Sequence, residues 1–238
     1  MNQFANPQNI LITGASSGIG AALALVYAKP GNKLHLGGRD ASRLDTVAEY
    51  VRKSGADCDT KVVNVTDRES MHDWIHPISE LDLVIANAGI SVSTRKQGYA
   101  VEIADADVFA TNVNGVVNTV APAISHMHER GQGQIALMSS LASFRAFREA
   151  PAYCASKAAV RFYGTGLRRA NTDEGIGISV ICPGFVRSPM TDANTFKMPM
   201  IMDAEVAAAL IQRKLARNRP MIAFPLRIYF AMRILALF

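Results

Sequence analysis

Short apolar runs alternate with longer amphipathic stretches along this chain of 238 residues. Runs of this kind have the length of buried strands, whereas the longer stretches have the length and spacing of helices. The pattern predicts strands over residues 9–13, 33–37, 59–65, 81–86, 134–139 and 177–182, and a last short strand that ends before Pro225. It predicts helices over residues 18–28, 42–53, 105–129, 152–172 and 226–238, and another around Trp74.

This regular alternation of strand and helix indicates the fold class. Strands separated by helices are typical of βαβ units, which form a parallel sheet with helices on both faces. We therefore expect one α/β domain over residues 1–238, with a doubly wound parallel sheet of about seven strands between two helix layers. Right-handed crossovers place the carboxyl ends of the strands along one edge, where such folds bind their ligands.

A glycine-rich turn follows the first predicted strand and opens the first helix. Glycines allow positive φ and a close approach of the backbone, and a helix N-terminus offers free N–H groups to a phosphate. The turn predicts a pyrophosphate site, with an ordinary strand-to-helix turn as the alternative for this motif alone. The candidate residues are Gly14, Ser16, Ser17, Gly18, Ile19 and Gly20.

The second predicted strand leads into Gly37-Gly38-Arg39-Asp40. In this architecture the strand end faces the adenosine ribose, where a carboxylate accepts from the ribose hydroxyls and repels a 2′-phosphate. Gly38 occupies the expected carboxylate position, and the guanidinium of Arg39 can pair with a 2′-phosphate. We therefore predict NADP(H) as the preferred cofactor. NAD(H) is the alternative, if Arg39 is solvated and Asp40 binds the ribose.

Tyr153 and Lys157 share one face of a predicted helix because they are four residues apart. A phenol titrates near pH ~10, and a nearby ammonium lowers its pKa, so the pair can act as a general acid and base. Ser140 follows the fifth predicted strand, and its hydroxyl can bind a substrate oxygen as charge develops there. Asn112 interrupts an apolar helix and therefore needs a buried polar partner or water.

The ordered set of these motifs resembles the short-chain dehydrogenase/reductase family in its compact single-domain form. The resemblance covers about residues 9–225. It implies a Rossmann fold and an oxidoreductase that interconverts a ketone or aldehyde and an alcohol by hydride transfer with NAD(P). The cofactor-binding residues that it implies, besides the turn and Arg39, are Asn64, Val65, Asn87, Ala88, Gly89, Tyr153, Lys157, Pro183, Gly184, Val186 and Ser188.

The resemblance also implies a role for each of four catalytic residues. Tyr153 exchanges a proton with the substrate oxygen, which Ser140 orients and stabilises. Lys157 binds the nicotinamide ribose and lowers the pKa of Tyr153. Asn112 holds a water that links Lys157 to bulk solvent.

Three positions depart from the family pattern. Asn64 stands where the family usually has an Asp that accepts from the adenine amino group, and an amide carbonyl can also accept. Ser17 stands where many NADP-preferring relatives carry a basic residue, which weakens the prediction of NADP(H). Ser188 replaces a common Thr, which is a mild change.

Substrate choice is expected to lie in residues 184–202, a methionine-rich segment that we interpret as a lid, with a loop packed on the core as the alternative. The residues just before Tyr153 are candidates for the pocket entrance, and their arginines favour an anionic group on the substrate. These residues are Phe144, Arg145, Phe147 and Arg148. The substrate itself stays open among lipid, polyketide, steroid-like and sugar carbonyls.

Composition and charge exclude several classes. The net charge of +5 is scattered, so no nucleic-acid partner is expected, and the three cysteines do not suggest a disulfide framework. His72 and His76 have no apparent third ligand, so no metal site is expected. The N-terminus has no signal pattern, and no run of about 18 apolar residues occurs, which predicts a cytoplasmic protein.

The apolar segment 226–238 carries only Arg227 and Arg233 as charged residues and is too short to span a bilayer. It favours a partner subunit in a homodimer or homotetramer, with a membrane surface as the alternative. Two other functions are a nucleotide-binding sensor or scaffold without turnover, and epimerase- or dehydratase-like modification of a nucleotide sugar. The four intact catalytic residues argue against the first, and the glycine spacing argues against the second.

Overall fold

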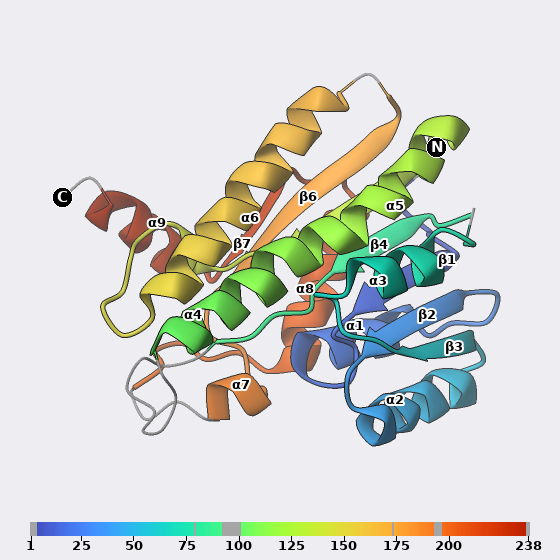
Figure 1. Cartoon of the computed structure of the whole chain (residues 1–238), viewed down its shortest axis with the longest axis horizontal. Coiled ribbons are helices and arrows are strands. Elements are labelled where there is room, and N and C mark those ends of the chain that lie inside the picture. Colours follow the sequence, from blue (N-terminus) through green and yellow to red (C-terminus); the bar gives the residue numbers. More distant parts are fainter. Residues whose placement is uncertain (1–3, 79, 92–100, 173, 193–196, 237–238) are drawn as a thin grey trace.

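The computed structural model describes residues 4–78, 80–91, 101–172, 174–192 and 197–236, with the backbone alone for residues 101–104. Within this part of the chain, seven strands form one parallel sheet in the order β3-β2-β1-β4-β5-β6-β7 (Figure 1). The strands are β1 Asn9–Thr13, β2 Lys33–Gly38, β3 Asp57–Val62, β4 Leu83–Ala86, β5 Gly133–Met138, β6 Ile176–Pro183 and β7 Met221–Phe224. The predicted doubly wound α/β fold is therefore confirmed.

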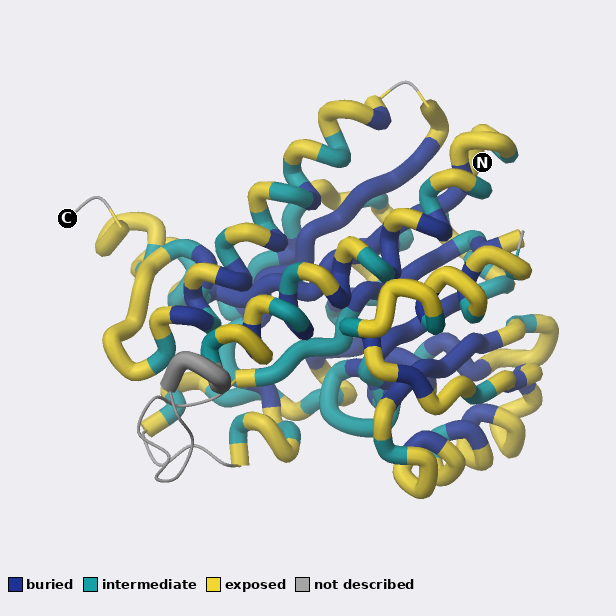
Figure 2. The backbone as a smooth tube through the Cα atoms, in the orientation of Figure 1, coloured by how far each residue is buried: buried dark blue, intermediate teal, exposed yellow. Residues whose placement is uncertain are grey.

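Helices cover both faces of this sheet. The helices are α1 Gly18–Tyr27, α2 Ala41–Lys53, α3 Arg68–Ile75, α4 Val101–Phe109, α5 Gly115–Arg130, α6 Pro151–Ala170, α7 Pro189–Asp192, α8 Ala204–Leu215 and α9 Leu226–Leu235. One hydrophobic core joins the sheet to α1, α2 and α8, and the other joins it to α3, α5 and α6. Figure 2 shows the result, a layer of buried strands between helices whose outer sides are exposed.

The alternation of side chains along each strand explains the two cores. Ile10 and Ile12 of β1 pack in the core with α1, whereas Leu11 between them packs in the core with α5. Successive strand residues point to opposite faces, so a strand buried on both faces must be apolar at every position. β5 and β6 come close to this condition: all their residues are buried, and only Gln134 and Ser179 are polar.

Two elements differ from the sequence prediction. The third strand ends at Val62 rather than at residue 65, because its exposed edge position stops pairing with β2 after Gly38. The predicted helix over 105–129 is interrupted by a π-helical turn, Ala110–Asn114, between α4 and α5. Such turns are rare and are often found at functional sites.

Helix α8 is an element that the sequence pattern did not predict. Asp203 precedes it and Glu205 lies in its first turn, which are signals of a helix N-terminus that the apolar pattern alone did not reveal. The last helix, α9, begins at the predicted residue Leu226 and ends at Leu235, and residues 237–238 lie outside the described part of the chain.

Candidate cofactor and catalytic site

The glycine-rich turn lies between β1 and α1 at the carboxyl edge of the sheet. Gly14 and Gly18 have φ of +67° and +53°, a left-handed conformation that favours glycine. A Cβ at Gly20 would lie 2.2 Å from the carbonyl oxygen of Gly14, so this position excludes any side chain. Ser17 precedes α1 without a capping bond from its side chain. The turn therefore leaves the N-terminus of α1 uncapped by its own side chain, as a phosphate site requires, and phosphate binding there stays a prediction.

Hydrogen bonds tie this turn to the end of β4. The Asn87 side-chain amide donates to the carbonyl oxygens of Thr13 at 2.9 Å and of Gly14 at 3.2 Å. The hydroxyl of Thr13 accepts from the backbone N–H of Asn87 at 3.1 Å and of Ala88 at 3.2 Å. Two motifs that are more than 70 residues apart in the sequence thus hold each other in place at the same edge.

The end of β2 lies beside the turn and lacks a carboxylate. Gly38 is buried, and a Cβ built on it would lie 3.4 Å from the Cβ and the Oγ of Ser16. Arg39 is exposed. Asp40 caps α2 by accepting from the backbone N–H of Arg43 at 3.0 Å and from its guanidinium Nε at 2.7 Å. The carboxylate of the NAD(H) alternative thus has Arg43 as a partner, and its remaining lone pairs leave that alternative open.

Asn64 and Val65 lie beyond the end of β3. The Asn64 side-chain oxygen accepts from the backbone N–H of Thr66 at 3.2 Å, so it forms a local turn. Val65 is buried, and its carbonyl oxygen accepts from the Asn118 side-chain amide at 2.9 Å. A bond from Asn64 to an adenine stays a prediction, and it would use the second lone pair of the same oxygen.

Ser140 and Tyr153 come together after β5 and at the start of α6. The Ser140 hydroxyl donates to the carbonyl oxygen of Pro183 at 3.4 Å and accepts from the backbone N–H of Ala142 at 3.1 Å. Burial raises the pKa of Tyr153, and a hydrogen bond with Ser140 acts in the opposite direction. The two hydroxyls thus stand at one place, beside the segment that Pro183 begins.

Lys157 lies one helical turn after Tyr153 and is only 3% exposed. Its Nζ donates to the carbonyl oxygen of Met138 at 2.9 Å and lies 5.8 Å from the centroid of the Tyr153 ring. Burial lowers the pKa of Lys157 to about 8. Lys157 is not among the causes of the Tyr153 shift, which burial dominates, so the lowering of the Tyr153 pKa by Lys157 stays a prediction.

Replacement of Lys157 by Met is expected to stabilise the protein by about 1–3 kcal/mol at pH 7. The folded-state pKa of about 8 lies below the ordinary value of 10.5, so the unfolded chain binds the proton more tightly. The cost of the buried ammonium is therefore full below pH 8 and disappears as pH rises from 8 to 10.5. Urea unfolding at pH 7 and at pH 10.5 measures the difference.

The exposed Lys61 provides the control for this prediction. Its replacement by Met should leave the free energy of unfolding nearly unchanged at both pH values. An exposed ammonium stays hydrated in the folded protein, so its removal relieves no desolvation cost. A Lys157→Met protein that is less stable than the wild type at pH 7 would contradict the prediction.

Asn112 connects the end of β4 to α6 from inside the π-helical turn. It is fully buried, and its amide exchanges two hydrogen bonds with the backbone of Ile90, at 2.8 and 2.9 Å. It also donates to the hydroxyl of Ser156 at 3.0 Å. A Cβ at Gly89 would lie 3.1 Å from both the Asn112 Oδ1 and the Lys157 Nζ. These contacts place Asn112 near Lys157, whereas its role in holding a water stays a prediction.

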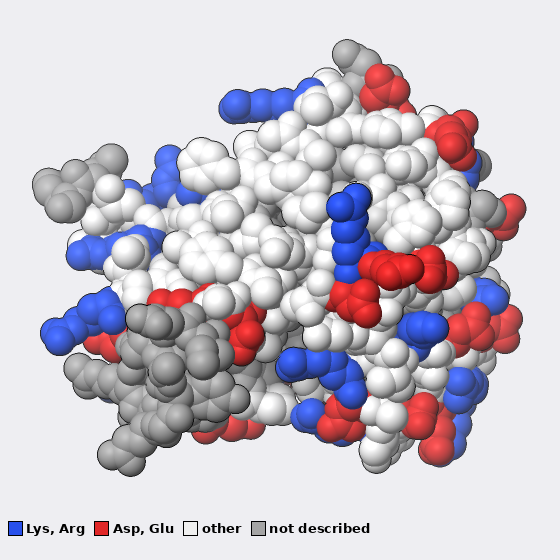
Figure 3. Space-filling view, viewed as in Figure 1, with Lys and Arg blue, Asp and Glu red and all other residues white. Residues whose placement is uncertain are grey.

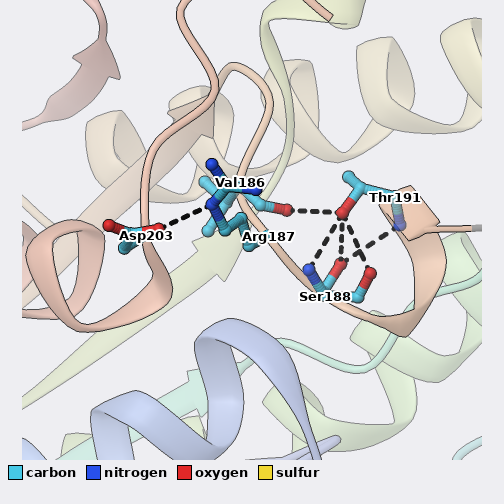
Figure 4. A network of polar contacts seen from close by, with 5 residues as sticks. All are labelled: Val186, Arg187, Ser188, Thr191 and Asp203. Carbon is cyan, nitrogen blue, oxygen red and sulfur yellow. Dashed lines mark hydrogen bonds and ion pairs between the residues drawn. The ribbon is translucent and has the colours of Figure 1, made fainter. Parts of the chain in front are cut away.

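The segment after β6 folds back over the glycine-rich turn. Val186 pairs with Met202 in a parallel bridge, and a Cβ at Gly18 would lie 2.9 Å from the Cβ of Ser188. Figure 4 shows how this segment is held: the Thr191 hydroxyl donates to the carbonyl oxygen of Val186 at 3.0 Å and accepts from the backbone N–H of Ser188 at 2.9 Å. The first part of the predicted lid, as far as Thr191, is therefore held in place by hydrogen bonds.

Thr191 is a residue that the sequence analysis missed. Its N–H also donates to the Ser188 hydroxyl at 3.3 Å, so the two residues cap the short α7 reciprocally. The Ser-x-x-Thr spacing was the available signal. Ser139 and Ser156 were likewise missed: Ser139 donates to the carbonyl oxygen of Lys157 at 2.7 Å, and Ser156 binds Asn112. Residues 193–196 of the predicted lid lie outside the described residues.

The arginines predicted at the pocket entrance have other partners. Arg145 donates to the carbonyl oxygen of Leu235 in α9 at 3.2 Å, and Arg148 pairs with Glu149 at 3.7 Å on the surface. Phe144 packs edge-to-face on Tyr229 of α9, with ring centroids 5.3 Å apart. These contacts turn the segment toward α9 and do not support an anionic substrate group.

Two further features of the described residues concern metal ions and membranes. In this part of the chain, no group of three or more His, Cys, Asp or Glu side chains is arranged to hold a metal ion. None of its helices is both long enough and apolar enough to cross a membrane.

Comparison with known proteins now identifies the family. The family model of short chain dehydrogenases matches residues 8–198. An uncharacterized oxidoreductase of Myxococcus xanthus is 32% identical over 219 residues, which cover 90% of this chain and 86% of the relative.

Two solved structures share the fold over nearly their full length. A short-chain dehydrogenase from Sphingobium yanoikuyae in complex with NADPH is 26% identical, with a TM-score of 0.85 over 97% of this chain and 92% of that chain. One from Burkholderia phymatum in complex with NAD is 24% identical, with a TM-score of 0.86 over 97% of this chain and 93% of that chain. The chain therefore belongs to the short-chain dehydrogenase/reductase family and is an oxidoreductase that acts on alcohol and carbonyl groups with a nicotinamide cofactor.

Proposed function

We propose that the protein is an NADP(H)-preferring reductase or dehydrogenase that interconverts a ketone or aldehyde and an alcohol. The observation that carries this proposal is the convergence of Ser140, Tyr153 and Lys157 beside Pro183, at the sheet edge that also holds the glycine-rich turn. A proton donor and a buried cation thus stand on the same edge as a phosphate-binding turn. This is the arrangement that hydride transfer to a carbonyl requires.

Each residue has a distinct part in the proposed mechanism. When the nicotinamide is bound, it supplies or accepts the hydride. Tyr153 donates its proton to the carbonyl oxygen during reduction and removes it from the alcohol during oxidation. Ser140 donates a hydrogen bond to the same oxygen as negative charge develops. Lys157, whose Nζ adjoins Gly89 and Asn112, binds the cofactor ribose and favours the phenolate of Tyr153.

The raised pKa of Tyr153 suits the direction of reduction. Burial holds the phenol protonated through neutral pH, so the proton donor is loaded before the carbonyl arrives. In the absence of substrate, the hydrogen bond with Ser140 acts against burial and favours the phenolate. Tyr153 therefore begins reduction with its proton bound, gives it to the substrate oxygen, and must be protonated again before the next turnover.

The end of β2 supports NADP(H) as the preferred cofactor. Gly38 adds no side chain beside Ser16, which leaves room for a phosphate group there. The exposed Arg39 next to it supplies a positive charge. Asp40 is bound to Arg43, which competes with ribose hydroxyls for its carboxylate oxygens. A fork of guanidinium donors recognises a phosphate better than any other side chain.

Replacement of Arg39 by Ala is expected to weaken NADPH binding about ten- to hundredfold and NADH binding less than about twofold. The loss corresponds to one charge-assisted hydrogen-bonding partner of the 2′-phosphate, which NADH lacks. Fluorescence titration of both cofactors measures the two dissociation constants. Lys53→Ala, at the far end of α2, is the control, and it should change neither. Equal losses for the two cofactors in the Arg39 variant would overturn the cofactor preference.

A further inference from the structure

Helix α9 exposes an apolar stripe to solvent. Leu226, Phe230 and Ile234 are 60%, 59% and 60% exposed, and their spacing of four residues places them on one side of the helix. The opposite side holds α9 to the protein through Ile228 and Tyr229, which pack near Phe144. None of the described residues of α9 is buried. The three apolar side chains of the stripe are therefore left largely uncovered by the described part of the chain.

Positive charge accompanies this apolar stripe. Residues 206–238 contain six basic residues and no acidic residue. Among the described residues, none of the six forms an ion pair. In Figure 3, Lys and Arg side chains project from the edge of the molecule at which Figure 1 places α9. The six residues are Arg213, Lys214, Arg217, Arg219, Arg227 and Arg233.

A groove continues the apolar stripe toward β7. Its volume is about 570 Å³, and it runs between α8, β7 and the first turn of α9. Leu226 and Tyr229 of α9 line it together with Met221, and two cations, Lys214 and Arg219, border it. The backbones of these two cations are joined by a hydrogen bond of 3.2 Å, so they stand together. An apolar groove with paired cations suits an amphipathic anion such as a lipid.

We propose that α9 and this groove dock on an anionic lipid surface. Leu226, Phe230 and Ile234 enter the interface between headgroups and acyl chains. The basic residues of α9 and of the groove, which are Arg227, Arg233, Lys214 and Arg219, bind the anionic headgroups. With ten residues, α9 is too short to cross a bilayer, so it lies in the plane of the surface. Arg227 can extend its guanidinium from the apolar side to the headgroups.

Charge favours a lipid surface over a second copy of this chain. In a two-fold symmetric contact the same patch faces itself, and residues 206–238 contain six basic residues and no acidic one, so the arginines of α9 would find no acidic partner in this segment of the second copy. Like charges brought together at an interface weaken association. An anionic surface reverses the sign of this interaction and stabilises the contact.

Co-sedimentation of the full-length protein with vesicles tests the proposal. We expect binding to vesicles of 70% phosphatidylcholine and 30% phosphatidylglycerol and little binding to pure phosphatidylcholine. Raising NaCl from 50 to 500 mM should weaken the binding, because salt screens the attraction to the headgroups. Arg227→Gln with Arg233→Gln should weaken binding about 30-fold, since each basic residue near an anionic surface contributes about a factor of five.

Phe230→Ser with Ile234→Ser should weaken vesicle binding at least about tenfold through the loss of buried apolar area. Both residues are exposed and lie outside the catalytic site, so turnover of a soluble ketone should not change. The matched controls lie on α2, beside β3 at the other edge of the sheet, and at the start of α3 (Figure 1). Tyr50→Ser removes a side chain that is 57% exposed, and Lys53→Gln with Arg68→Gln removes two positive charges. Neither control should alter vesicle binding.

Three outcomes would overturn the proposal. The first is no binding to the anionic vesicles, and the second is equal binding by the wild type and the Phe230/Ile234 variant. The third is a change of oligomeric state. If light scattering finds a dimer for the wild type and a monomer for the Phe230/Ile234 variant, the stripe binds a second copy of the chain. Loss of turnover is measured separately, so a failure of the docking proposal would leave the proposed reaction untouched.

Discussion

Replacement of Tyr153 by Phe is expected to lower the rate of ketone reduction by about 10²–10⁴-fold, while NADPH binding changes less than about twofold. The variant removes one hydroxyl, and with it the proton donor that stands beside Ser140. The ring itself stays in place near Lys157, so the cofactor site keeps its shape. Steady-state kinetics with NADPH and fluorescence titration of the cofactor separate the two effects.

Tyr163 on the same helix provides the matched control for this prediction. It is partly buried, and burial raises the pKa of its phenol as well. Tyr163 packs against the core with α3 and α5, away from Ser140. Tyr163→Phe should therefore keep nearly the full rate. A Tyr153→Phe protein with wild-type turnover would show that another group delivers the proton.

Replacement of Gly38 by Asp is expected to shift cofactor preference toward NADH by about two to three orders of magnitude. The new Cβ would lie 3.4 Å from Ser16 and 3.6 Å from Leu44, which is ordinary contact, so the fold should tolerate it. The carboxylate would accept from the ribose hydroxyls of NADH and repel the 2′-phosphate of NADPH. The ratio of kcat/KM for the two cofactors measures the shift.

Gly166 offers a control in which the same carboxylate is added elsewhere. It lies in α6 with open space around its Cβ position, so Gly166→Asp should be accommodated as easily. Its ratio of kcat/KM for NADPH and NADH should equal that of the wild type. If Gly38→Asp also leaves this ratio unchanged, the 2′-phosphate is not bound at the end of β2, and the cofactor preference is wrong.

The order of motifs along the chain was sufficient to predict the fold and the composition of the candidate site. The glycine-rich turn, Asn87 and Ser140 each follow a buried strand, and Pro183 is the last residue of one. In a parallel sheet with right-handed crossovers these strand ends meet at one edge, so proximity follows from topology alone. Tyr153 and Lys157 could be paired because helix geometry sets the direction of residues four apart.

Other features could not be predicted because they depend on contacts between distant segments. The π-helical turn at Asn112 is accompanied by hydrogen bonds to Ile90 and Ser156, which lie 22 and 44 residues away. The partner of Arg145 is a backbone carbonyl 90 residues later, in α9. Local patterns carry no information about such pairs. The shift in the pKa of Tyr153 was also beyond sequence reasoning, because burial dominates it.

Transfer of deuterium from NADPH that carries two deuterium atoms at C4 tests the proposed reaction most directly. The wild-type protein would be incubated with this cofactor and a mixture of ketones and aldehydes, and the alcohols would be analysed by mass spectrometry. We expect at least one alcohol to gain one deuterium at the former carbonyl carbon, and we expect none with Tyr153→Phe. Binding of the labelled cofactor without deuterium in any alcohol would contradict the account.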